Sequence, residues 1–361
     1  MKHDDSRLPF LDLLRALASQ AIVLHHSAFY GPLSDTARSV ASAAIDGLSQ
    51  HARLAVQVFF VVSGYLTAVG LRKREPATLR ELASLFASRY RRIGLPYLGA
   101  LLLAIGANEV ARHWMDHPSI SARPSAGQLL AHVFLVHDLA GYEPLSAGIW
   151  YLAIDLQLVL LVGFVFWLGA RLLGSERGPL GGRILLALLG VASLFWFNRL
   201  ARLDHLAIYF IGAYALGLIA AWVQMGSVRR TFFWAYAVLV ALAIAVDFRS
   251  RLLVALTTAL VLALGAHFGW LARWPRSRLI QWVASISYSL FLVHFPISLV
   301  VNAFWSSHVP NTPWLSLLGM VTAYALSMVA AIVFHYKVER RLMRVGRVRS
   351  LGNRLAPGEL R

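Results

Sequence analysis

The 361-residue chain contains no cysteine, and only 14% of its residues are charged. Without thiols it forms no disulfide, has no thiolate nucleophile and holds no cysteine-ligated zinc. Soluble domains carry about 25% charged and about 45–50% apolar residues, whereas here the hydrophobic share is 58% and the mean hydropathy is +0.62. This composition excludes a soluble domain and predicts an all-α, polytopic membrane bundle.

Acidic residues are also scarce, because 17 Asp and Glu face 34 Lys and Arg. Nucleic-acid binding would use such an excess of positive charge. Cytoplasmic loops of membrane proteins are rich in Lys and Arg for topological reasons, so we expect no nucleic-acid partner. The chain also lacks the HExxH pattern, the P-loop and the nucleophile elbow. We therefore expect no metal site and no NTPase, metalloprotease or serine hydrolase.

Apolar runs long enough to cross a bilayer, about 20 residues each, are numerous. We predict ten spans, near residues 9–28, 54–71, 93–111, 148–170, 183–198, 205–224, 232–248, 251–270, 280–303 and 315–336. The run at 127–140 is too short and is predicted to be a buried or interfacial helix. The first run contains Arg15 and lacks a convincing small-residue cleavage site, so we expect it to remain as a helix and not to be removed as a signal peptide.

Charge predicts the orientation of these spans. With ten spans both ends of the chain lie on one side, where 25 of the 34 basic residues fall, whereas 8 fall on the other side. The positive-inside rule then places both termini in the cytoplasm. No internal repeat is apparent, so we treat residues 1–340 as one transmembrane domain and residues 341–361 as a basic cytoplasmic tail, solvated or lying on anionic lipid.

The first span carries ionisable residues, which are costly in a bilayer unless they face the protein interior. Arg15 and His26 are eleven positions apart, so in a helix they lie about 16 Å apart on nearly the same face. Asp12 precedes Arg15 by three residues, and an ion pair within one turn is expected. His25 is rotated away by about 100°. The competing interpretation is an interfacial histidine pair without a catalytic role.

Other polar residues lie in or beside later spans. Arg89 and Arg92 share a face beside Pro96 and would suit a phosphate-bearing ligand, although topology alone would also explain them. We expect their alanine variants to fold, because surface charges contribute little to stability. The remaining candidates for a substrate cavity or a structural role are Gln57, Ser63, Trp150, Asp155, Gln157, Tyr288 and His294.

Each of these remaining candidates has its own simplest explanation. Ser63, next to Gly64, is explained by close helix packing, and Trp150 suits the aromatic belt at the membrane interface. Gln57 would hydrogen-bond a neighbouring helix or a ligand. The intramembrane carboxylate of Asp155 is expected to pair with one of the cations already named.

Five stretches, in this order along the chain, resemble the acyltransferase-3 family, bacterial membrane enzymes that O-acylate cell-envelope and secreted carbohydrates. They are "LDLLRALASQAIVLHH", "FFVVSGYL", "RYRRIGLPYL", "WYLAIDLQ" and "SYSLFLVH". The chain departs from the family pattern at three positions. Relatives often have an acidic residue at the position of Gln57. They usually have Glu at the position of Asp155 and Pro at the position of Arg341.

The resemblance implies transfer of an acyl group, with acetyl the expected one, from cytoplasmic acyl-CoA to a carbohydrate hydroxyl at the inner membrane of a bacterium. Acyl-CoA is then a co-substrate, no cofactor is held permanently, and membrane lipids and the carbohydrate are the other partners. His26 would be the general base, or in a variant mechanism the carrier of the acyl group. Arg15, paired with Asp12, would orient the donor, and Arg89 and Arg92 would bind its phosphates.

Two functions without acyl transfer remain open from the residues themselves. A transporter or flippase would use the same polar face to move a polar or lipid-linked substrate, and a regulatory membrane protein would use it to bind CoA or lipid phosphates. Transporters often contain repeated halves and broken helices. Isotope transfer from acyl-CoA to carbohydrate distinguishes the enzyme from both alternatives.

Overall fold

The computed structural model describes residues 8–72 and 75–343, and within these ranges it contains helices and no β-strand. The first six α-helices are α1 (Pro9–Phe29), α2 (Pro32–His51), α3 (Val56–Leu71), α4 (Leu79–Trp114), α5 (Ala126–Val133) and α6 (Trp150–Phe195). The others are α7 (Ala207–Gln224), α8 (Arg230–Val246), α9 (Ser250–His267), α10 (Trp270–Arg273), α11 (Arg278–His308) and α12 (Pro313–Phe334). Short 3-10 turns cover Ala52–Ala55, Phe197–Arg199 and Ala201–Leu203, and a π-helical turn, His335–Glu339, extends α12.

The predicted spans coincide with helices. Seven helical segments of the described chain are long and apolar enough to cross a membrane, and they contain α3, α4, α6, α7, α9, α11 and α12. The other predicted spans correspond to α1, to the 17-residue α8 and to the second half of α6, which Gly174 separates from the first half. The prediction of a helical membrane bundle is confirmed.

One helix was not predicted, and another is shorter than predicted. The connection after the first span contains the 20-residue helix α2, which its many polar residues concealed from a search for apolar runs. This helix packs on α1 and α12 through a small core that contains Ala28, Ala37 and Ile45. The helix predicted at 127–140 ends already at Val133 and continues as turns.

The helix α4 begins well before the predicted span at 93–111, because Thr78 caps it. The Thr78 hydroxyl accepts a hydrogen bond from the Glu81 amide at 3.3 Å, and the Glu81 carboxylate accepts one from the Thr78 amide at 3.1 Å. This reciprocal capping box satisfies two backbone donors at the helix start. Arg89 and Arg92 therefore lie within a regular helix, as their common face requires.

Close contact between α3 and α7 fixes the position of α3. A Cβ on Gly64 would overlap the backbone carbonyl of Tyr214, and one on Gly217 would overlap that of Val61. Small residues allow this approach of two membrane helices, which confirms the packing role predicted for Gly64. Its neighbour Ser63 has a different role, described below.

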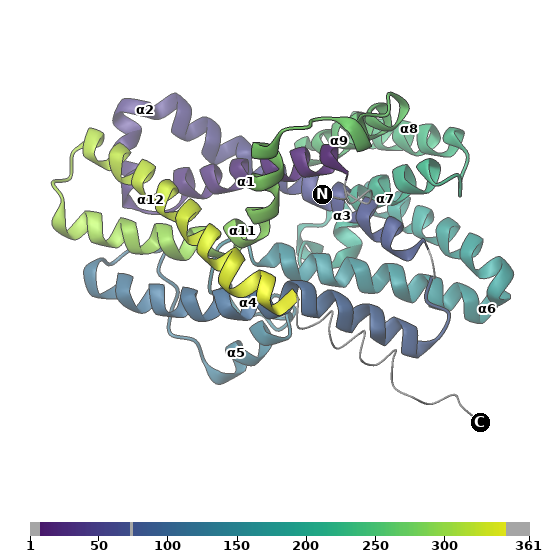
Figure 1. Cartoon of the computed structure of the whole chain (residues 1–361), viewed down its shortest axis with the longest axis horizontal. Coiled ribbons are helices and arrows are strands. Elements are labelled where there is room, and N and C mark those ends of the chain that lie inside the picture. Colours follow the sequence, from purple (N-terminus) through teal and green to yellow (C-terminus); the bar gives the residue numbers. More distant parts are fainter. Residues whose placement is uncertain (1–7, 73–74, 344–361) are drawn as a thin grey trace.

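The helices that carry the predicted site residues meet one another. α1 packs against α11 and α3, and α4 packs against α11 and α6. Figure 1 shows α2 and α12 at one end of the bundle and α8 and α9 at the other, with α1, α3, α4 and α11 between them. This arrangement brings side chains from α1, α3, α4, α6 and α11 together in the interior.

Candidate active site

A cavity of about 140 Å³ lies where these five helices meet, and we call it the Arg15 cavity. It collects six of the predicted site residues, namely Arg15, Ser63, Arg89, Arg92, Asp155 and Tyr288. Three aromatic residues, Phe59, Tyr151 and Phe291, form another part of its wall. These six candidates, which lie far apart in the sequence, therefore line one cavity.

Arg89 and Asp155 form a buried ion pair on the wall of this cavity. Nε and Nη2 of Arg89 donate to Oδ2 of Asp155 at 3.1 and 2.5 Å, and Nη2 also donates to Oγ of Ser63 at 3.0 Å. The Ser63 hydroxyl in turn donates to Oδ1 of Asp155. The expectation that Asp155 pairs with a named cation is confirmed, and Ser63 satisfies both partners in addition to lying at a helix crossing.

The pair is well shielded, because the Asp155 side chain is 3% exposed and that of Arg89 is 19% exposed. A charge removed from water this far needs its partner, since an unpaired buried charge costs several kcal/mol. The premise that Arg89 is a surface charge is therefore wrong, and we expect its alanine variant to lose stability. The sequence suggested a surface position because Arg89 lies in the basic run "RYRR", whereas the early start of α4 places it inside the bundle.

The other two arginines of the cavity have fewer partners. Arg15 lies 3.9 Å from Oδ1 of Asp12, which confirms the expected ion pair, and its Nη2 donates to Oγ of Ser287 at 3.4 Å. Arg92 makes no hydrogen bond or ion pair with any residue in the described ranges, and its guanidinium faces the cavity. Tyr288 donates its hydroxyl proton to the backbone carbonyl of Ile93 at 2.5 Å.

His26 and His294 lie against each other in the interior. Nδ1 of His26 is 2.7 Å from Nε2 of His294, and the two rings are stacked with centroids 5.0 Å apart. Both residues are buried. Arg15 and His26 thus both contact α11, at Ser287 and His294, which confirms that they share a face of α1.

The hydrogen bonds around His294 fix the protonation pattern of the neutral pair. Nδ1 of His294 lies 2.9 Å from the backbone carbonyl of Leu290. A carbonyl oxygen only accepts, so this Nδ1 carries the proton and Nε2 is the acceptor. We infer that Nδ1 of His26 donates to it, which leaves Nε2 of His26 with a free lone pair. A base oriented by a second group in this way is the arrangement that proton abstraction needs.

His25 points elsewhere. Its Nδ1 lies 3.3 Å from the carbonyl oxygen of Leu48 on α2, and its ring packs against Phe29. The rotation predicted from helical spacing therefore separates the two adjacent histidines, one toward α11 and one toward α2.

Gly148 connects the histidine pair to the Arg15 cavity. Its φ of +82° lies in the left-handed region, and a Cβ there would be 3.3 Å from Cε1 of His26 and 3.2 Å from the ring of Phe291. Phe291 also lines the Arg15 cavity. One aromatic ring thus lies at the cavity wall and close to the backbone that contacts His26, and only glycine fits at 148 without displacing either ring.

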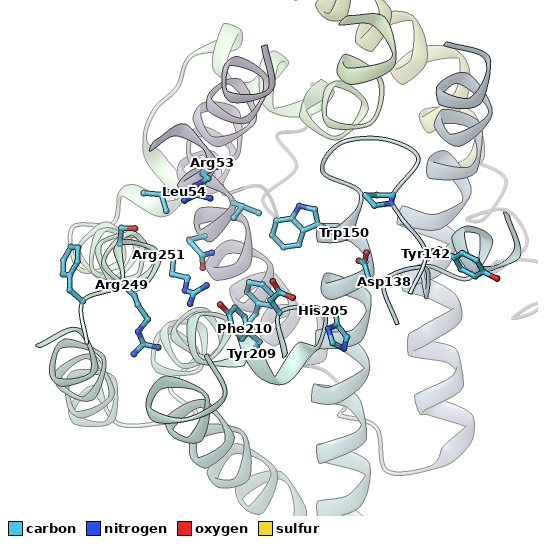
Figure 2. Close-up of a pocket in the computed structure, with 16 residues that line it drawn as sticks. Arg53, Leu54, Asp138, Tyr142, Trp150, His205, Tyr209, Phe210, Arg249 and Arg251 are labelled. Atoms are coloured by element: carbon cyan, nitrogen blue, oxygen red, sulfur yellow. The ribbon is translucent and has the colours of Figure 1, made fainter. Parts of the chain in front are cut away.

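A second, larger cavity of about 840 Å³ contains two further candidates, Gln57 and Trp150. We call it the Arg53 cavity (Figure 2). Its wall also holds Arg53, Arg249 and Arg251. The structure therefore separates the predicted site residues into two chambers and a histidine pair.

Gln157 lies in neither cavity and has a structural role. Its Oε1 accepts a hydrogen bond from the amide of Ala207 at 3.0 Å, and its Nε2 donates to the carbonyl of His205 at 3.2 Å. Ala207 is the first residue of α7, where backbone amides lack helical partners. Gln157 therefore anchors the start of α7.

Some residues of the Arg15 cavity were not predicted. Glu339 lines it, accepts a hydrogen bond from the Ser289 hydroxyl at 2.6 Å and lies 2.9 Å from Nδ1 of His335. In the sequence, basic residues surround it in "FHYKVERR", a pattern that favours an interfacial ion pair. The available signal was a carboxylate at the end of an apolar run. Ser287 and Phe291 lie in the stretch "SYSLFLVH" that resembles the family, but neither was named as a site residue, since both residue types are common in membrane helices.

No group of three or more His, Asp or Glu side chains in the described part of the chain could hold a metal ion. Residues 344–361 of the predicted basic tail, and Lys2, Arg7, Lys73 and Arg74 of the counted charges, lie outside the described residues.

The comparisons with known proteins agree with the motifs. No significant match was found among curated proteins or among solved structures. A family model described as an acyltransferase domain matches residues 8–335, which include α1 through α12, the wall of the Arg53 cavity and the wall of the Arg15 cavity except for Glu339 and Met343. Because this match spans nearly the whole chain, the protein belongs to the acyltransferase-3 family of membrane acyltransferases.

Proposed function

We propose that this acyltransferase moves an acyl group, with acetyl the expected one, from cytoplasmic acyl-CoA to a hydroxyl of an envelope or secreted carbohydrate. The observation that carries the proposal is the buried His26–His294 pair, whose 2.7 Å contact leaves Nε2 of His26 free as a base. Gly148 and Phe291 lie between this histidine pair and the Arg15 cavity, which three arginines line. The family match supports acyl transfer over transport or regulation.

The proposed reaction needs one proton transfer in each direction. Nε2 of His26 takes the proton of the acceptor hydroxyl while the hydroxyl oxygen attacks the thioester carbonyl. The tetrahedral intermediate expels the CoA thiolate, which receives the proton from the imidazolium of His26. The products are an O-acyl sugar and free CoA. General-base catalysis of this kind contributes about 10²–10⁴-fold in rate. An acyl-histidine intermediate is the variant mechanism.

The Arg15 cavity is the proposed site of the donor. Nε and Nη2 of Arg89 already bind Asp155 and Ser63, which leaves Nη1 for a phosphate oxygen. Arg92 has no hydrogen-bond or ion-pair partner in the described ranges, and the contacts of Arg15 with Asp12 and Ser287 are long, at 3.9 and 3.4 Å. These two arginines are the main proposed phosphate ligands, because guanidinium groups bind phosphate oxygens bidentately. Arg15 and His26 are about 16 Å apart along α1, a distance that an extended pantetheine arm covers.

Arg92→Gln is expected to weaken acetyl-CoA binding by about 10- to 100-fold, the usual effect of losing a hydrogen bond to a charged group. Arg91→Gln is the matched control, because Arg91 is exposed, lies outside the cavity and bonds only to the carbonyl of Ala87 at 3.2 Å. Equilibrium binding of acetyl-CoA to the purified protein measures both. Equal affinity in the two variants would show that Arg92 does not bind the donor and only contributes to the positive charge of the cytoplasmic side.

We also propose that both termini lie in the cytoplasm of a bacterium with the protein in its inner membrane, as the distribution of basic residues supports. Reporter fusions after residues 80 and 350 are then expected to read as cytoplasmic, and a fusion after residue 120 as external. A cytoplasmic signal at residue 120 would contradict the proposed orientation, and with it the delivery of acyl-CoA from the cytoplasmic side.

A further inference from the structure

The Arg53 cavity is built from connections that lie far apart in the sequence. Its wall comes from the turn before α3, the loop after α5, the start of α6, the turn before α7 and the segment between α8 and α9. All of these connections are predicted to lie on one side of the membrane, opposite the termini. Its volume of about 840 Å³ lies within the range of small-molecule sites, about 300–1,000 Å³.

One wall of this cavity is cationic. Arg249 is held in place, since it donates to Oδ1 of Asn198 and to the carbonyl of Leu194, both at 2.8 Å. Arg251 donates one hydrogen bond to the backbone of Asn198 at 2.9 Å and lies over the ring of Tyr209, 4.6 Å from its centroid. Arg251 has no carboxylate partner within the described ranges.

Arg53 has fewer side-chain partners in the described ranges than Arg249 and Arg251 have. It is exposed and lines the cavity, and it makes no hydrogen bond or ion pair with the part of the chain that the structure describes. A guanidinium binds carboxylate and phosphate oxygens through charge-assisted hydrogen bonds. Arg53 and Arg251 together therefore offer donors to an acidic group that enters the cavity.

The opposite wall has different chemistry. Asp138, Asp204 and His205 line it, and Figure 2 shows Asp138 and His205 across the cavity from Arg249 and Arg251, with Trp150 between the two sides. Burial raises the pKa of the Asp138 carboxyl, and the charge of Asp204 raises it further, whereas His205 opposes this. Such groups accept hydrogen bonds from hydroxyls and disfavour a second anion.

One residue of the cavity wall lies close in the chain to the backbone that borders His26. Trp150 lines the cavity, and Gly148, two residues earlier, contacts His26. Two residues of extended chain span at most about 7 Å. The backbone at Trp150 therefore lies within about 7 Å of the backbone at Gly148, which borders the ring of His26.

We propose that the Arg53 cavity binds the acceptor and selects an acidic saccharide, with its carboxylate or phosphate on Arg53 and Arg251, its ring on Trp150 and its hydroxyls toward Asp138 and Asp204. This proposal rests on the proposed function because it names the acceptor of that reaction. A neutral saccharide would leave the arginines of one wall unpaired, whereas an anionic lipid headgroup such as phosphoglycerol would offer the carboxylates of the other wall fewer hydroxyl donors than a saccharide.

The test compares two probes that differ only in charge, trigalacturonate and its carboxyl-reduced counterpart trigalactose. Calorimetric titration of the full-length protein in neutral detergent measures their affinities. Trigalacturonate is expected to bind about tenfold or more tightly than trigalactose, and Arg53→Gln is expected to remove about tenfold of its affinity without affecting the neutral trimer. The advantage of the acidic probe is expected to shrink at high salt.

Arg38→Gln is the control for the change in overall charge, because Arg38 lies on α2, is exposed and pairs with Asp46 at 3.0 Å outside the cavity. It is expected to bind both trimers as the wild type does. Equal binding of the two trimers, absence of binding by trigalacturonate, or equal effects of the Arg53 and Arg38 variants would overturn the proposal. So would displacement of trigalacturonate by equimolar phosphatidylglycerol but not by phosphatidylcholine, which would assign the cavity to a lipid headgroup.

The outcome is independent of the proposed chemistry, since no acyl donor is present in the titration. His26→Ala is expected to keep the preference for trigalacturonate. If the preference is observed and no acyl transfer is found with acetyl-CoA, the proposed reaction fails and the acidic ligand stands. If acyl transfer is found without the preference, the reverse holds.

Discussion

His26→Ala is expected to abolish acyl transfer, with a loss of about 10²–10⁴-fold from the missing general base. His26→Gln keeps a polar side chain but has no titratable nitrogen, so it is expected to be equally inactive. The measurement is transfer of isotope from labelled acetyl-CoA to carbohydrate in purified membranes. Acetyl-CoA binding is expected to persist in both variants, because a base acts mainly in the chemical step and not in donor binding.

His25→Ala is the matched control, because His25 is the adjacent residue and is also buried but bonds to the carbonyl of Leu48 on α2. It is expected to retain most of the activity. Substantial activity in His26→Gln, or inactivity confined to the His25 variant, would contradict the mechanism. No isotope transfer by the wild-type protein with any acyl-CoA would contradict the enzyme itself and favour a transporter.

Arg89→Ala is expected to destabilise the folded protein by about 3–5 kcal/mol, because it leaves the Asp155 carboxylate buried without its partner. The Asp155 side chain is 3% exposed, so water does not replace the guanidinium. The result is a large fall in the melting temperature of the purified protein, or its loss from the membrane. Arg92→Ala is the control on the same helix face and is expected to melt as the wild type does.

The double variant Arg89→Met/Asp155→Leu separates stability from function. It removes both charges together, and replacing a buried ion pair with apolar side chains is often neutral for stability. We expect it to recover most of the melting temperature while its acetyl-CoA affinity stays reduced. A single Arg89→Ala variant that melts as the wild type does would show that the pair is solvated and would contradict its burial.

The sequence was sufficient for the class of the protein and for the shared face of Arg15 and His26. Hydropathy counts apolar residues in a window, so it located the spans, and it missed α2 because that helix is polar and packs through a few small residues. Helical periodicity is a property of one segment. It therefore placed His26 and His25 on different faces, as their contacts with His294 and Leu48 confirm.

The partners of these residues depended on tertiary structure. His294 lies 268 positions from His26, and Asp155 lies 66 positions from Arg89. No local pattern links such pairs, because the packing of α1 on α11 and of α4 on α6 brings them together. The Arg53 cavity is the extreme case, since its wall comes from five connections. The sequence alone determined which residues are costly to bury, and only the packing of the helices decided which group compensates each of them.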